Sequence, residues 1–224
     1  MYPMLLMLPT VNKGKSLKGK PYQRLKQVSK EQQREDMEKL WQEHETKKMD
    51  IEEGSKWYLI STEWFNQWKL WCGFKSPLKN SEESTQDPLD TSDSPLSQEI
   101  EEPGRIDNYD ILDTSEIMLF GEYNLKDNLT EEDDYIIVHP DIWKYLYSIY
   151  DGTPIVRTAI KNFDSLEEAD TAECIIEVNL VKLYIFEVPR EHKQDYYEVM
   201  LASRNMDMAD VKIRICTKKK IKER

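Results

Sequence analysis

The stretch Pro103-Gly104-Arg105-Ile106-Asp107-Asn108 constrains the fold more than any other part of this 224-residue chain. Proline fixes one backbone dihedral and glycine adopts conformations closed to other residues, so Pro103 and Gly104 predict a tight turn. Side chains of Asp and Asn readily hydrogen-bond nearby backbone groups, and Asp107 and Asn108 are placed to do so. We therefore expect an ordered loop, which either braces the fold or contacts a partner.

Upstream of this loop the sequence is rich in tryptophan, with four indoles within fifteen residues: Trp57, Trp64, Trp68 and Trp71. Thr62 is a candidate cap for a helix whose apolar residues share one face: Trp64, Phe65, Trp68, Trp71 and Cys72. Because each indole buries a large area, the pattern predicts a core nucleus. An exposed aromatic binding face is the alternative.

Downstream, residues 135–138 read as a strand that His139-Pro140 ends, because proline cannot donate to a sheet. Asp141 is the expected cap of the next helix, with these residues inward: Trp143, Leu146, Tyr147 and Tyr150. Gly152 is expected to end that helix as a left-handed cap. A second strand is predicted over residues 154–160.

The charge pattern divides the chain. Its net charge is −12, yet residues 1–30 hold seven Lys or Arg and no acid, and residues 212–224 are also strongly basic. We therefore predict four units. The first, over 1–54, is a flexible basic arm followed by a charged helix that Ser29 caps, and the second, over 55–163, is a domain with a disordered acidic insert at 75–102. An extension over 174–216 and a basic tail over 217–224 follow. The apolar stripe of the charged helix is thin, so we expect that helix to need a partner or a neighbouring domain (Met37, Leu40, Trp41, His44 and Lys48).

Taken together, the tryptophan helix, the Pro-Gly loop, the Tyr-Ile-Ile-Val strand and Gly152-Thr153-Pro154-Ile155 resemble the DUSP domain, a module of ubiquitin-specific proteases. The resemblance covers roughly residues 56–180. It implies an α+β tripod, in which a helical bundle packs on a short antiparallel sheet, and a protein–protein interaction role. The candidate partner-binding residues are those of the hallmark loop: Gly104, Arg105, Ile106, Asp107, Asn108 and Tyr109.

The C-terminal region is similar to the start of a ubiquitin-like domain, with a hairpin over 176–202 and the beginning of a helix at 207–212. Alternation of Val211, Ile213 and Ile215 equally fits a strand. Hydrophobic alternation changes phase between Leu180 and Val181, which predicts either a bulge or a segment that moves to another sheet. We expect this extension to be swapped with a partner, covered by one, or added to the first sheet as a long hairpin.

Catalysis is not expected. The three cysteines (Cys72, Cys174 and Cys216) lack the sequence box of a protease nucleophile, and no zinc or phosphate-loop spacing is present. We therefore predict no catalytic, cofactor-binding or metal-binding residues. The odd, widely spaced cysteines are typical of a reducing compartment. This favours the cytoplasm, with the cytoskeleton or cilium, or the mitochondrion, as alternatives.

These patterns lead to three hypotheses. The first is a non-catalytic adaptor of the ubiquitin system; the second is a structural subunit of a cytoskeletal or ciliary assembly; the third is a non-catalytic fragment of a ubiquitin-specific protease. All three require protein partners and membership of a larger complex, with acidic surfaces as candidates for the basic tails. Nucleic acid is not expected, because the acidic body repels phosphates. A membrane partner is not expected either, because the longest early apolar run, residues 4–8, is far below the ~20 residues of a membrane span.

Overall fold

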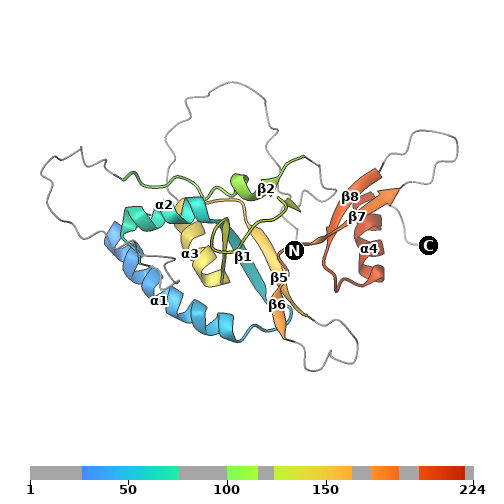
Figure 1. Ribbon diagram of the computed structural model, residues 1–224, viewed down its shortest axis with the longest axis horizontal. Helices are drawn as coiled ribbons and strands as arrows, with labels where there is room; N and C mark the ends of the chain where they lie inside the picture. The colour runs from blue at the N-terminus through green and yellow to red at the C-terminus, as the bar shows by residue number, and fades with distance from the viewer. Residues whose placement is uncertain (1–26, 76–99, 116–123, 163–172, 187–196, 220–224) are drawn as a thin grey trace, which may run out of the picture.

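A computed structural model describes residues 27–75, 100–115, 124–162, 173–186 and 197–219 of the chain. The predicted arm up to residue 26, most of the acidic insert and the last five residues lie outside these ranges. Figure 1 shows three helices gathered on one side of a curled sheet, and a smaller hairpin and helix on the other side. The elements follow in this order: α1 Lys30–Met49, β1 Lys56–Ser61, α2 Thr62–Cys72, the 3-10 turn η1 Tyr109–Ile111, β2 Leu112–Asp113, β3 Asn124–Leu125, β4 Tyr135–Val138, α3 Pro140–Tyr150, β5 Ile155–Lys161, β6 Cys174–Ile176, β7 Val181–Phe186, β8 Tyr197–Ala202 and α4 Met208–Lys219. The predicted α+β class is confirmed.

The central sheet is antiparallel, with strand order β4-β1-β5-β6. Side chains of β1 alternate between two cores: Ile60 joins the helical core, while Trp57 and Leu59 face a second core under η1. Because both faces of the sheet are covered, all four residues of β4 are buried. This arrangement places the η1 loop directly beside the first strand.

The helical core is built on the tryptophan helix. Trp64, Phe65 and Trp68 are buried there, and the ring of Phe65 stacks between those of Trp41 and Trp68 at 5.6 and 5.5 Å. The prediction of a core nucleus is confirmed, and an exposed aromatic face on α2 is excluded. Thr62 is not the cap. It is the first residue of the helix, and its hydroxyl donates to the carbonyl of Glu132 at 3.2 Å.

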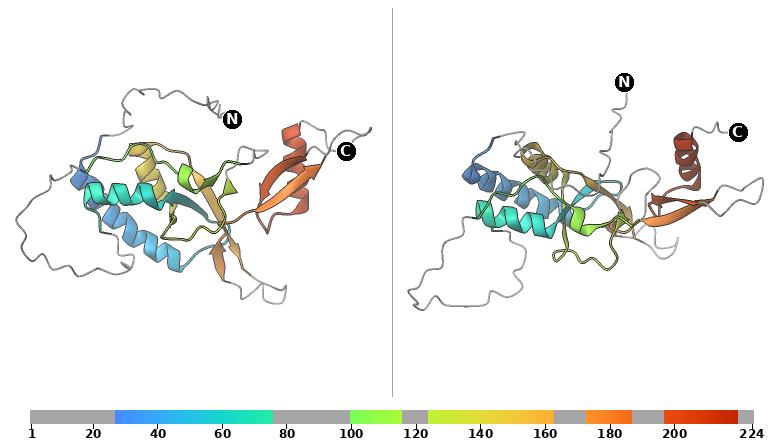
Figure 2. Two further views of the ribbon diagram at one scale, coloured as in Figure 1. Left: turned by 45° about the horizontal axis from the view of Figure 1, so that its top comes forward. Right: turned by 90° about the horizontal axis from the view of Figure 1, so that it is seen from above.

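Helix α1 packs inside this body, although the sequence analysis grouped it with the arm. It is capped by Ser29 as predicted, and it buries Met37 and Trp41 among residues of α2 and α3. Its thin apolar stripe suffices because two buried polar residues, Gln33 and His44, find partners in the body. Figure 2 shows α1 lying alongside α2 in both views.

Helix α3 differs from prediction at both ends and on one face. His139, not Asp141, is its cap: His139 Nδ1 accepts from the Asp141 backbone N–H at 3.3 Å. The Asp141 carboxylate instead pairs with Lys47 at 3.0 Å. Tyr147 is exposed rather than inward. At the C-terminus, Asp151 takes the left-handed φ of 57°, and Gly152 follows at φ 155°.

The C-terminal extension is divided between two sheets. β6 completes the central sheet, whereas β7 pairs only with β8 among the described strands, so the phase change at residue 180 marks a move between sheets. The alternative of a hairpin added to the first sheet is therefore wrong. Residues 208–219 form helix α4, not a strand, and the helix runs into the predicted tail as far as Lys219.

Candidate functional site

The hallmark loop is fastened to the body by its inward residues. Ile106 is buried, and its backbone N–H donates to the carbonyl of Asp151 at 3.1 Å. Asn108 is also buried: its Oδ1 accepts from the N–H of Ser61 at 2.8 Å, and its Nδ2 donates to the carbonyl of Leu59 at 3.3 Å. These bonds satisfy backbone groups at the end of β1, where the ladder to β5 has already stopped.

The alternate residues of the same loop face solvent. Gly104, Arg105, Asp107 and Tyr109 are exposed, and Tyr109 has 67% of its surface accessible. Each is still held in place. The carbonyl of Gly104 accepts from Trp64 Nε1 at 3.2 Å, and Asp107 Oδ1 accepts from the Tyr109 N–H at 2.9 Å. Arg105 Nε lies 3.2 Å from Asp151 Oδ2. The loop thus presents exposed side chains on an anchored backbone.

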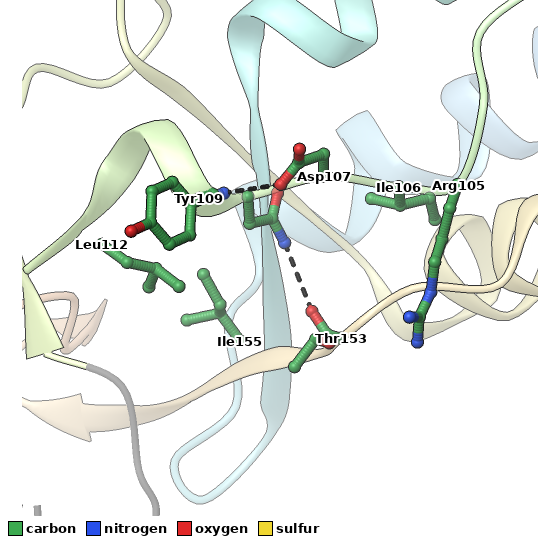
Figure 3. Close-up of a pocket in the computed structure, with 8 residues that line it drawn as sticks. Arg105, Ile106, Asp107, Tyr109, Leu112, Thr153 and Ile155 are labelled. Carbon is green, nitrogen blue, oxygen red and sulfur yellow. Dashed lines mark hydrogen bonds between the residues drawn. The ribbon is translucent and has the colours of Figure 1, made fainter. Parts of the chain in front are cut away.

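Two hollows are lined by Tyr109. The first, of about 320 Å³, is lined by Arg105, Ile106, Asp107, Asn108, Tyr109, Leu112, Thr153 and Ile155. Figure 3 shows Tyr109 and Leu112 at one end of it, Arg105 at the other, and Ile155 and Thr153 along its floor. The second, of about 300 Å³, is lined by Ser61, Glu63, Trp64, Gln67, Asp107, Tyr109 and Asp110. Both are shallow and suit side chains of a partner rather than an enclosed ligand.

Five of the six predicted binding residues line the first hollow; Gly104 does not, although its carbonyl binds Trp64. Whether the six bind a partner stays a prediction. Sequence reasoning missed the walls supplied by other elements, such as Glu63 and Gln67 from α2. Thr153 and Ile155 belong to the motif Gly152-Thr153-Pro154-Ile155, but the sequence of that motif does not predict that it lies against the loop.

The described thiols and imidazoles do not form a reactive pair. Burial raises the pKa of the Cys72 thiol to about 11, so the sulfur stays protonated at neutral pH. Burial, with the charge of Lys48 adding to it, lowers the pKa of His44 to about 4. No hydrogen bond joins a cysteine to a histidine within the described ranges, and no cluster of three or more metal-ligating side chains occurs in them. His192 lies outside these ranges.

Where the structure describes helices, none is both long and apolar enough to cross a bilayer.

Comparison with known proteins supplies the family. The model of the DUSP domain matches residues 54–161. Ubiquitin carboxyl-terminal hydrolase 4 of Rattus norvegicus is 30% identical over 141 residues, which is 61% of this chain and 12% of that protein. Ubiquitin carboxyl-terminal hydrolase 15 of Homo sapiens is 28% identical over 144 residues, which is 62% of this chain and again 12% of the relative. Ubiquitin carboxyl-terminal hydrolase 5 of Arabidopsis thaliana is 28% identical over 148 residues, 62% of this chain and 14% of the relative.

The alignments thus span 12% to 14% of the length of these three hydrolases. The matched model begins just before β1 and ends with β5, so it contains the tryptophan helix, the anchored loop and most of the central sheet. Residues 54–161 of this chain are a DUSP domain, homologous to the DUSP region of the ubiquitin carboxyl-terminal hydrolases.

Proposed function

We propose that this chain is a non-catalytic adaptor of the ubiquitin system, which binds a partner protein through the hallmark-loop surface: Gly104, Arg105, Ile106, Asp107, Asn108 and Tyr109. The observation that carries the proposal is the exposed ring of Tyr109 on a loop whose backbone is anchored through Asn108. A large aromatic side chain with few rotatable bonds, carried at the surface on an anchored backbone, loses little entropy on binding, which is typical of interface anchors.

The non-catalytic part of the proposal draws on the chemistry of the described residues. A buried, protonated Cys72 and neutral His44 are unsuited to nucleophilic attack. The matched region corresponds to the DUSP domain alone. The free cysteines fit a cytoplasmic setting.

A second candidate, a structural subunit of a larger assembly such as a cytoskeletal or ciliary complex, is favoured by the hairpin β7–β8. Three aromatic rings are exposed together there, with the ring of Tyr197 5.3 Å from Tyr184 and 5.7 Å from Phe186. Apolar surface gathered in this way is typical of a contact face. The same hairpin is compatible with the third hypothesis, a non-catalytic fragment of a ubiquitin-specific protease.

Affinity capture from native lysate tests these proposals. The bait is the full chain, compared with Tyr109→Ala and with Leu70→Ala, which removes an equally exposed apolar side chain from α2. We expect deubiquitinases or ubiquitin ligases to be recovered by the wild type and Leu70→Ala but not by Tyr109→Ala. Recovery of tubulin or a stoichiometric complex that ignores Tyr109 and requires Phe186 would instead support the assembly role. Cleavage of a ubiquitin-fusion reporter by the purified chain would overturn the non-catalytic proposal.

A further inference from the structure

The two hollows beside Tyr109 share a wall but differ in chemistry. Tyr109 and Asp107 line both of them, so the two hollows adjoin at these two residues. A segment that crosses Tyr109 therefore meets both hollows at once. The backbone that carries Tyr109 is anchored through Ile106 and Asn108, so both hollows are built on one fixed stretch of chain.

The surface that lines the first hollow is largely apolar. Ile106, Leu112 and Ile155 contribute aliphatic side chains, and the carbonyl of Thr153 is already bonded to Asn108 at 3.4 Å. Arg105 is the one cation among its lining residues, and its guanidinium pairs with Asp151. This side suits an aliphatic side chain of modest size.

The second hollow carries negative charge next to an aromatic ring. Glu63, Asp107 and Asp110 line it, and no Lys, Arg or His does. Within the described ranges none of these three carboxylates forms an ion pair, although Lys126 donates to the backbone carbonyl of Asp110. A cation placed here gains attraction from the carboxylates and from the face of Tyr109.

Resting on the proposed function, we infer that the occupant is an extended segment of a partner protein with a Lys or Arg two positions from an aliphatic residue. In an extended chain alternate side chains lie on one side, roughly 7 Å apart, which is about the span of an intervening aromatic ring. The cation enters the side lined by Glu63, and the aliphatic group enters the side lined by Ile155. Charge complementarity distinguishes this occupant from an acidic segment, which the three carboxylates repel.

The test is a titration of the isotope-labelled full chain, followed by NMR, with capped peptides of defined sequence. The probes are Gly-Arg-Ala-Val-Gly and its reverse, since the direction of binding is open, and the same pair with Gln in place of Arg. We expect the Arg peptides to shift the amide signals of Gln67, Tyr109 and Thr153. The Gln peptides should bind about fivefold more weakly, and raising the salt to about 0.3 M should weaken the Arg peptides by a similar factor.

Glu63→Gln supplies the matched variant, because Glu63 is exposed and Glu38→Gln makes the same charge change on an exposed position of α1. Glu63→Gln should lose the preference for Arg over Gln, while Glu38→Gln should retain it. Equal binding of the Arg and Gln peptides, an unchanged preference in Glu63→Gln, or shifts confined to other surfaces would overturn the inference. If one of these results were found while capture from lysate still depended on Tyr109, the proposed function would stand. Only the inference that the partner segment carries a Lys or Arg would be overturned.

Discussion

The side-chain oxygen of Asn108 accepts a hydrogen bond from the backbone N–H of Ser61 over 2.8 Å, across 47 residues of sequence. The nitrogen of the same amide donates to the carbonyl of Leu59. The Asn108 side chain thus makes, at the end of β1, the hydrogen bonds that a neighbouring strand would otherwise make, and it joins the loop to the sheet. Buried and exposed residues alternate over positions 105–109. The backbone that Ile106 and Asn108 anchor is therefore the same backbone that carries the exposed side chains.

Replacing Asn108 should therefore destabilise the domain without touching the exposed surface. Asn108→Ala removes a buried acceptor and donor and leaves backbone groups of β1 unsatisfied, so we expect a loss of about 2–4 kcal/mol in the free energy of unfolding. Urea unfolding monitored by tryptophan fluorescence measures it. Asp107→Ala is the neighbouring control, expected to change stability by less than about 1 kcal/mol because Asp107 is exposed. Equal effects of the two substitutions would contradict this account.

Gln33 should prove essential to the docking of α1. Its Oε1 accepts from Trp68 Nε1 at 3.1 Å and from the Tyr150 hydroxyl at 2.9 Å, so one buried amide joins three helices. We expect Gln33→Ala to cost about 1–3 kcal/mol, since the buried Trp68 Nε1 loses its acceptor, whereas the Tyr150 hydroxyl keeps Glu102 Oε1 at 3.0 Å. Gln32→Ala, on the exposed side of the same helix, should be nearly neutral. A neutral Gln33→Ala, seen in the same urea experiment, would show that α1 is held by its apolar contacts alone.

The contribution of Gln33 also explains where sequence reasoning succeeded and failed. Apolar patterns predicted the tryptophan core, the strand at 135–138 and the helix after it, because burial follows local periodicity. Packing of α1 on a neighbouring domain was one of its predicted outcomes, but the burial of Gln33 was not predicted, since its hydrogen-bond partner Tyr150 lies 117 residues away. Hydrogen bonds between distant side chains leave no periodic signal in a sequence.

The candidate site divides in the same way. The hallmark loop was found from its own composition, because Pro, Gly, Asp and Asn restrict the backbone locally. The walls supplied by Glu63 and Gln67 were not, since hydrogen bonds between residues distant in sequence, from Ser61 to Asn108 and from Trp64 to Gly104, hold α2 beside the loop. By contrast, the cap of α3 has a local cause: the helix begins at Pro140, a residue favoured at the first helical position, so His139 is the cap and Asp141 is left to pair with Lys47.

Acid should weaken the fold through His44. Burial lowers the pKa of this imidazole from 6.5 to about 4, so the unfolded chain takes up the proton first as the pH falls. Stability from this group is complete above about pH 6.5 and is lost progressively down to about pH 4, by up to about 3 kcal/mol. The lowered pKa of His139 acts in the same direction, whereas that of Asp141 acts at lower pH.

Urea midpoints measured between pH 7 and pH 4 test this expectation. His44→Gln keeps an acceptor for the His139 N–H but cannot titrate, so its stability should fall less steeply over that range. The pKa of the His44 imidazole, followed directly by NMR, should lie well below that of a free histidine. An unchanged slope in His44→Gln together with an ordinary pKa would refute the assignment.

Substitution by alanine should lower the stability of the domain far more at Gly152 than at Gly104. A Cβ on Gly152 would lie 2.7 Å from Ile106 Cβ and 3.1 Å from the Ile106 carbonyl oxygen, and its φ of 155° disfavours other residues. We expect Gly152→Ala to cost about 2–5 kcal/mol, because both the strand-like contact with Ile106 and the backbone must shift. Gly104→Ala meets open space and should change stability by about 1 kcal/mol or less. Thermal unfolding of both variants measures the difference in stability. If Gly152→Ala were tolerated, the loop would be free to move away from the end of α3. The anchored backbone inferred to support Tyr109 would then be lost as well.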